Sequence, residues 1–115
     1  MKDNAHLSLE FGISCLKDAA IRHRKFELAE ECLGRLVMIK RESYGEMHDS
    51  LLVPILTLSG VQDAIHKVDL ALENYQQGID ICEHLLSTDL TGEKQEAVVR
   101  LYCEFLDNVI HTYNS

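Results

Sequence analysis

The side chains best suited to chemistry are histidines and acids that lie one helical turn apart. Asp80 and His84 have this spacing, and so do Asp107 and His111. Two such side chains on one helix can share a metal ion, because imidazole and carboxylate groups both bind divalent cations. Two ligands do not complete a site, and the sequence places no third ligand beside either pair. We therefore favour ordinary pairs on a helix surface, and we expect no metal and no cofactor.

The cysteines are the other candidates for chemistry, as nucleophiles. A reactive cysteine needs a nearby base and a lowered pKa. Cys15 with His23 and Cys82 with His84 are the closest pairs in sequence, and neither spacing places both side chains on one helical face. No CxxC pair, Gly-rich phosphate loop, nucleophile elbow or paired-carboxylate motif occurs. We predict that the chain is not an enzyme and that its cysteines are reduced core residues: Cys15, Cys32, Cys82 and Cys103.

The charge balance argues against several classes of partner. The 115 residues have a formal net charge of −8, which disfavours binding to a phosphate backbone and favours a basic partner or none. No apolar run approaches the length of a membrane span, and the polar start at residues 1–4 does not resemble a secretory signal. We expect one domain over residues 1–115, in the cytoplasm or alternatively the nucleus, without a nucleic-acid or membrane partner.

The elements that position these residues are predicted to be helices throughout. Breakers are sparse: there are six glycines and a single proline, Pro54, which falls in the first turn of a helix where its missing N–H costs little. The polar stretches 42–49 and 87–92 read as loops, and the end from Thr112 to Ser115 reads as a polar tail. The 3.6-residue period of apolar side chains predicts an all-α fold with helices over 4–23, 25–41, 50–65, 68–86 and 92–111.

The sequence also repeats itself. Residues 26–29 (FELA) recur as 68–71 (VDLA) at an offset of 42, and the passage that starts at Tyr44 recurs from Thr91 at an offset of 47. The second and fourth helices are apolar over an unusually wide arc. A helix needs two apolar stripes when it is clamped between two neighbours, so this pattern favours a repeat array over a simple bundle.

The B-helix positions of this repeat resemble those of tetratricopeptide repeats. Ala29 and Ala71 occupy the small-residue position, with Phe26 and Val68 three residues before and Leu33 and Tyr75 four residues after. The spacing and the Gly-Glu loops are similar to those of kinesin light chains. Lys17 and Leu36 depart from small-residue positions, and Arg24 and His66 stand where the family often has glycine. The resemblance implies a right-handed stack of antiparallel helix pairs with a concave groove that grips a peptide or a helix.

The same resemblance implies which residues face the groove. Ser14, Asp18 and Thr57 do not match the basic carboxylate clamp of chaperone-binding members, and Leu56-Thr57 replaces the paired asparagines of kinesin light chains. Neither of those ligand classes is therefore expected. The implied groove residues are Phe11, Ser14, Asp18 and Arg22 in the first helix, Val53, Leu56, Thr57, Gly60 and Asp63 in the third, and Arg100, Cys103, Glu104, Asp107 and His111 in the fifth.

The character of these positions suggests a function as a protein-binding adaptor. Apolar Phe11, Val53 and Leu56 would anchor an amphipathic or basic-apolar segment, and acids such as Asp18 and Asp63 would line the rim. The acids are equally explained as a solvated face. The alternative function is a structural scaffold subunit, a homodimer or part of a larger helical-repeat assembly, that associates through the far face of the fifth helix or the open side of the first hairpin.

Overall fold

The computed structural model describes residues 4–114, with side chains from Leu9 onwards. Within this range it is all-α, without strands, as predicted. Five α-helices and one 3-10 turn follow one another: α1 Asn4–Arg22, α2 Phe26–Tyr44, the turn η1 Asp49–Leu51, α3 Leu52–Ala64, α4 Val68–Leu86 and α5 Gly92–Asn114. The expectation that the chain does not start with a secretory signal concerns residues 1–4, and residues 1–3 lie outside the described range.

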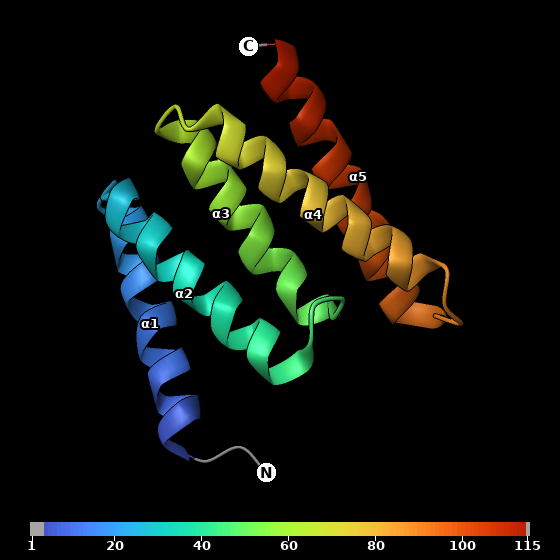
Figure 1. The fold of residues 1–115 in the computed structure, drawn as a ribbon, viewed down its shortest axis with the longest axis horizontal. Coiled ribbons are helices and arrows are strands. Elements are labelled where there is room, and N and C mark those ends of the chain that lie inside the picture. The colour runs from blue at the N-terminus through green and yellow to red at the C-terminus, as the bar shows by residue number, and fades with distance from the viewer. Residues whose placement is uncertain (1–3, 115) are drawn as a thin grey trace.

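Consecutive helices run in opposite directions and each packs against the next (Figure 1). α2 and α4 lie nearer the viewer in that figure, and α1, α3 and α5 lie behind them. The molecule measures 44 × 34 × 20 Å, so it is flat in the direction across these two layers. α2, α3 and α4 each have a neighbouring helix on both sides. This arrangement explains why α2 and α4 are apolar over a wide arc.

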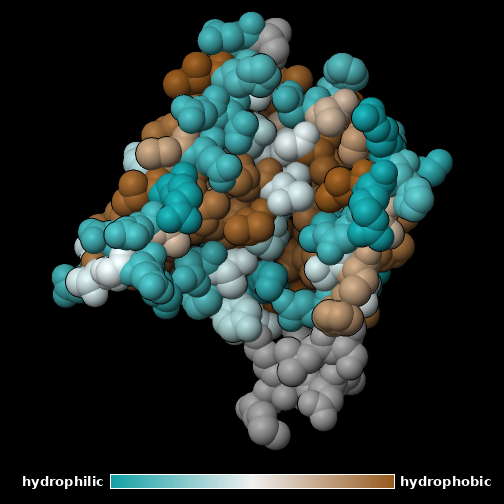
Figure 2. Space-filling model, turned by 180° about the vertical axis from the view of Figure 1, so that it is seen from behind, coloured by the Kyte–Doolittle hydropathy of each residue, from teal (hydrophilic) through white to brown (hydrophobic). Residues whose placement is uncertain are grey.

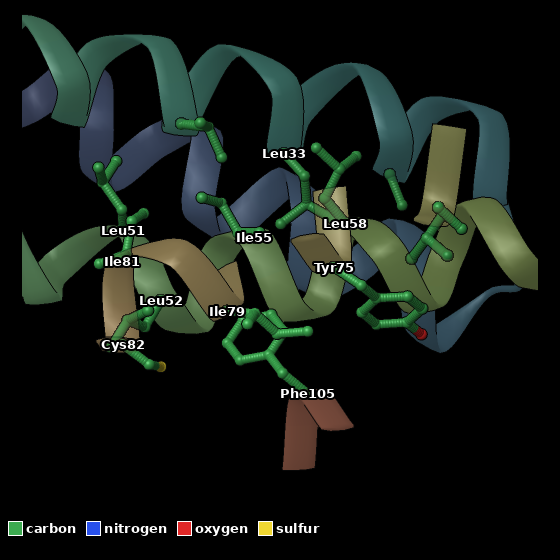
Figure 3. Close-up of a cluster of buried hydrophobic side chains, with 14 of the residues drawn as sticks. Leu33, Leu51, Leu52, Ile55, Leu58, Tyr75, Ile79, Ile81, Cys82 and Phe105 are labelled. Atoms are coloured by element: carbon green, nitrogen blue, oxygen red, sulfur yellow. The ribbon is translucent and has the colours of Figure 1, made fainter. Parts of the chain in front are cut away.

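The core is divided into a large cluster and a small one. The large cluster joins all five helices, α1 through Ala20 near its end, and includes Leu33, Ile55, Tyr75 and Phe105 (Figure 3). The Phe105 ring meets the edge of Tyr75, with centroids 6.4 Å apart at an interplanar angle of 77°. The small cluster joins α1 to α2 and consists of Ile13, Cys32 and Leu36, with Ile39 packed beside them. The first helix is thus held by the small cluster along its length and by Ala20 in the large cluster near its end.

Two tight turns, after α1 and after α3, have the same backbone geometry. Arg24 and His66 have positive φ angles of 57° and 64°, and they are 42 positions apart. The next residue in each turn closes it with a backbone hydrogen bond of 2.8 Å, from Lys25 N–H to the carbonyl of Ala20 and from Lys67 N–H to that of Gln62. A positive φ is the conformation that glycine adopts at no steric cost, so both turns hold a residue with a side chain in a region that favours glycine.

α2 and α5 extend further than predicted, because polar residues predicted as loop or tail belong to these helices. α2 continues through Glu42 and Ser43 to Tyr44, since neither residue breaks a helix, and it ends at Gly45, whose φ is 92°. The predicted start at 50 is a 3-10 turn, capped by His48 Nδ1, which accepts a hydrogen bond from Ser50 N–H at 3.1 Å. The predicted polar tail is also wrong, because α5 extends to Asn114 and buries Thr112.

Candidate functional site

A pocket of about 220 Å³ opens where α1, α2 and α3 meet. Its floor comes from α2 and its two walls come from α1 and α3, which are two of the three helices predicted to line the groove. Three predicted groove residues lie together here: Ser14, Val53 and Thr57. The remaining lining residues are Lys17, Leu33, Leu36, Lys40 and Pro54.

The pocket has an apolar floor and walls whose polar groups are largely occupied. Leu33 and Leu36 are buried members of the two core clusters, so the floor is fixed by packing on both of its sides. Thr57 Oγ1 donates a hydrogen bond to the carbonyl of Val53 at 2.9 Å, which uses its only donor within its own helix. A ligand group that enters here therefore meets hydrocarbon at the floor and both apolar and polar groups at the walls.

Two lysines stand at the rim, each beside an acid. Lys17 Nζ lies 2.7 Å from Asp18 Oδ1, and Lys40 Nζ lies 2.7 Å from Glu10 Oε1. Because each positive charge is matched by a carboxylate, the rim is close to neutral. The carboxylate of Asp18, a predicted rim acid, is thus engaged by a neighbour on its own helix.

Large apolar side chains are exposed next to the pocket. Val53, which lines it, is 58% exposed, and Phe11, one turn before Ser14 on α1, is 73% exposed. Leu56, the third predicted anchor, is half-buried and packs against the large core cluster. Figure 2, which views the molecule from behind relative to Figure 1, shows brown and white residues gathered towards the centre of the face and teal residues along much of its margin.

The other predicted groove residues lie elsewhere. Arg22 is exposed at the end of α1, and Asp63 is half-buried near Tyr75, whose hydroxyl pKa is raised by burial and further by the Asp63 charge. The α5 residues are all exposed and none lines the pocket: Arg100, Glu104, Asp107 and His111.

The sequence reasoning missed the part of the pocket that α2 supplies. It drew groove residues from the first, third and fifth helices, whereas Leu33, Leu36 and Lys40 come from the second. The signal was present in the wide apolar arc of that helix, and in Leu36, which is large at a position where the repeat is usually small. A large side chain at that position supplies the floor of the pocket.

A second depression, of about 320 Å³, lies between the end of α2, the following loop and α4. Its lining is mostly polar, with charges of both signs from Arg41, Glu46 and Asp80, and Arg41 bridges it through a hydrogen bond to Gln77. No predicted groove residue lines it. We place the candidate site in the smaller pocket, between α1 and α3, because three predicted groove residues line it and one of them, Val53, is an exposed apolar side chain.

The cysteines are divided between the core and the surface. Burial, together with the neighbouring Glu83 charge, raises the pKa of the Cys82 thiol to about 11, which disfavours the nucleophilic thiolate. The expectation that every cysteine lies in the core was wrong: Cys32 and Cys82 are buried, but Cys15 and Cys103 lie on outward faces of their helices and are exposed. From Leu9 to Asn114, no group of three or more His, Cys, Asp or Glu side chains is arranged to hold a metal ion.

No helix among the described residues combines the length and hydropathy that crossing a membrane requires. Comparisons with protein-family models, with curated proteins and with solved structures found no match to this chain.

Proposed function

We propose that this chain is a protein–protein interaction module that binds a peptide or helix of a partner over the pocket between α1 and α3. The observation that supports this proposal most is the exposure of Phe11 and Val53 beside a pocket with a hydrocarbon floor. Exposed apolar side chains around a preformed depression are typical of surfaces that bury a partner's side chain.

The repeated geometry supports reading the fold as tetratricopeptide-like. The two matching turns at Arg24 and His66 recur at the offset of the sequence repeat, and the pocket walls come from the helices that correspond to the groove-lining A helices of that family. In this proposal the partner lies across α1 and α3, and one of its apolar side chains enters the pocket.

The charges indicate what kind of segment fits. Lys17 and Lys40 are each matched by an acid, so the rim offers no strong field of either sign. Asp18 is engaged by Lys17, and Asp63 does not line the pocket, so neither acid adds an unmatched charge beside the anchor. We therefore propose an amphipathic segment whose affinity comes chiefly from its apolar anchor, with only a weak dependence on salt.

A peptide-display selection against the intact chain tests the function. Peptides recovered with the wild type are expected to contain one or two large apolar residues. The double variant Phe11→Asp/Val53→Asp should lower their affinity at least about tenfold, because it removes the equivalent of a few buried methylene groups. Fluorescence anisotropy measures the affinity. Met38→Asp is the matched control, since Met38 is equally exposed on α2 and does not line the pocket. Recovering no peptide, or peptides that bind the double variant unchanged, contradicts the proposal.

The alternative function, a self-associating scaffold, requires a second apolar surface away from this pocket, and α5 has one.

A further inference from the structure

α5 has two apolar stripes, and only one of them faces the core. Val98 and Phe105 are buried against the rest of the molecule. The second stripe consists of exposed side chains: Val99, Cys103, Leu106, Ile110 and Tyr113. Ile110 is 59% exposed and Tyr113 is 72% exposed. Apolar spheres follow the left edge of Figure 2, which is the side where α5 lies.

The spacing of this second stripe is that of a coiled-coil seam. Its members follow one another at intervals of four, three, four and three residues, so they repeat every 3.5 residues on average. A surface helix with isolated apolar residues has no reason to keep such a period over more than three turns. α5 is also the last helix of the series and packs only against α4 and, to a lesser extent, α3. The seam is therefore a helix-pairing surface without a described partner helix.

The charges beside the seam identify the partner. Arg100 and Asp107 flank it on the same side, seven residues apart. In an antiparallel pair of identical helices the residues of this flank meet each other, and opposite charges there select partner and orientation. When Val99 lies opposite Ile110 of the second copy, Arg100 of each copy faces Asp107 of the other. Tyr102 and Val109, on the other flank, then face each other as an apolar pair.

We propose that this chain forms a two-fold symmetric dimer through antiparallel pairing of α5, with Val99, Cys103, Leu106 and Ile110 in the seam and two Arg100–Asp107 ion pairs beside it. This surface is separate from the pocket between α1 and α3. One pair of helices buries less than the roughly 800 Å² per partner of a standard interface, so the dimer dissociates in the micromolar range.

Sedimentation equilibrium across a range of concentrations tests the dimer. The wild type is expected to shift from monomer to dimer, and Ile110→Asp should remain monomeric while keeping its helical circular dichroism, because Ile110 is exposed in the monomer. Met38→Asp, an equally exposed apolar residue on α2, should leave the dissociation constant unchanged. A wild type that stays monomeric at the highest attainable concentration overturns the proposal, and so does an Ile110→Asp variant that dimerises like the wild type.

A charge exchange tests the register. Arg100→Asp places acids opposite acids at two symmetric positions and should weaken the dimer by about tenfold or more, whereas the double variant Arg100→Asp/Asp107→Arg should restore it. Failure of the double variant to restore the affinity overturns the ion pairing.

Cys103 reports the orientation of the two helices. In the antiparallel register the two Cys103 Cα atoms are about 10 Å apart, beyond disulfide range and within reach of a short bis-maleimide. In a Cys15→Ser background, which removes the other exposed thiol, the crosslinker should link the dimer through Cys103 and mild oxidation should not. Efficient disulfide formation through Cys103 would indicate parallel helices and overturn the proposed arrangement.

Discussion

The contact of α2 with α3 and the contact of α4 with α5 are packed with side chains of different sizes. Leu36 on α2 corresponds to Gly78 on α4, 42 positions later, and Leu58 on α3 corresponds to Phe105 on α5, 47 positions later. At the second place a Cβ on Gly78 would overlap the Phe105 ring, so the aromatic ring occupies the space of the absent side chain. At the first place Leu36 packs in the small cluster and lines the open pocket.

The comparison contrasts a closed joint with an open pocket at two positions that correspond in the sequence. Gly78 with Phe105 closes the joint between α4 and α5 with full burial of the ring. Leu36 lines the open pocket between α1 and α3, whereas Leu58 packs in the large cluster, so the two leucines belong to different clusters. The first pair combines two leucines, and the second pair combines a glycine with a phenylalanine. Only the first pair has a member that lines an open pocket.

The largest expected effect comes from emptying the closed joint. Phe105→Ala removes a fully buried ring and should lower the free energy of unfolding by about 3–5 kcal/mol, a large share of the stability of a domain of this size. The midpoint of urea denaturation measures it. Phe11→Ala is the control, and it should change stability by less than about 0.5 kcal/mol since that ring is exposed. Similar effects of the two substitutions would contradict the account of the joint.

Two glycine substitutions sharpen the comparison between the helices. Gly78→Ala forces a methyl group against the Phe105 ring and should lower the free energy of unfolding by about 1–2 kcal/mol. This figure is the cost of overpacking less the gain in helix propensity from glycine to alanine. Gly34→Ala, on α2, meets no atom within 4 Å and should raise stability by about 0.5–1 kcal/mol. Thermal unfolding of both variants should therefore show shifts of opposite sign. A stabilising Gly78→Ala would mean that the ring is free to move away.

The two matching turns should respond alike. Arg24→Gly and His66→Gly each relieve a left-handed conformation, at a cost in the entropy of the unfolded chain, and should each raise stability by about 0.5–1 kcal/mol. Ala64→Gly, in the last turn of α3, is the control and should lower stability by about as much. Chemical denaturation checks all three, and a clearly unequal response of Arg24 and His66 would show that the turns differ.

The smallest expected effect concerns an acid that joins α2 to the second hairpin. Glu30 accepts hydrogen bonds from Lys67 Nζ at 2.7 Å and from Gln62 Nε2 at 3.1 Å. Burial raises the pKa of Glu30, but these two hydrogen bonds and the Lys67 charge outweigh it and hold the pKa below its ordinary value of 4.5. A lowered folded-state pKa stabilises the fold above the ordinary pKa, and this contribution is lost as the pH falls below it.

Glu30→Gln should accordingly cost about 0.5 kcal/mol at neutral pH, because Lys67 is half exposed, and should flatten the loss of stability on acidification. Denaturation measured at several pH values checks the slope. Exposed Glu96→Gln serves as the comparison and should leave the slope nearly unchanged. An equal slope for wild type and Glu30→Gln would contradict the assignment.

The helices followed from the sequence because their apolar period is sustained for more than three turns each. The helix ends did not follow from the sequence, since Glu42 and Ser43 are as compatible with a last helical turn as with a loop. The polarity of Thr112 suggested a tail, but the side chain is buried by neighbours that the sequence does not identify. The exposed Cys15 and Cys103 were misplaced for a related reason. Periodicity shows that a face is apolar, but it does not show which apolar face has a neighbour.

Part of the candidate site was also predictable. The resemblance to the repeat predicts Ser14, Val53 and Thr57, because it assigns them to positions on α1 and α3 that face the same side of the molecule. The rest depends on how closely the helices approach and where long side chains fold, as with Lys40, which spans from α2 to Glu10 on α1. The same limit explains α5: Arg100 and Asp107 are exposed as predicted groove residues should be, yet they flank a different surface from the pocket.

The attachment of α1 to a single neighbour has a consequence for dynamics. In a linear array each element is held by its nearest-neighbour contacts, so an end element with one neighbour opens at a lower free energy than the interior. α1 packs against α2 through the small cluster of Ile13, Cys32 and Leu36, and it contributes only Ala20 to the buried residues of the large cluster. Its amides should therefore exchange with solvent by local opening, without unfolding α3 and α4. Since α1 forms one wall of the pocket, a bound segment would slow that exchange selectively, and the protection of α1 becomes a direct readout of occupancy.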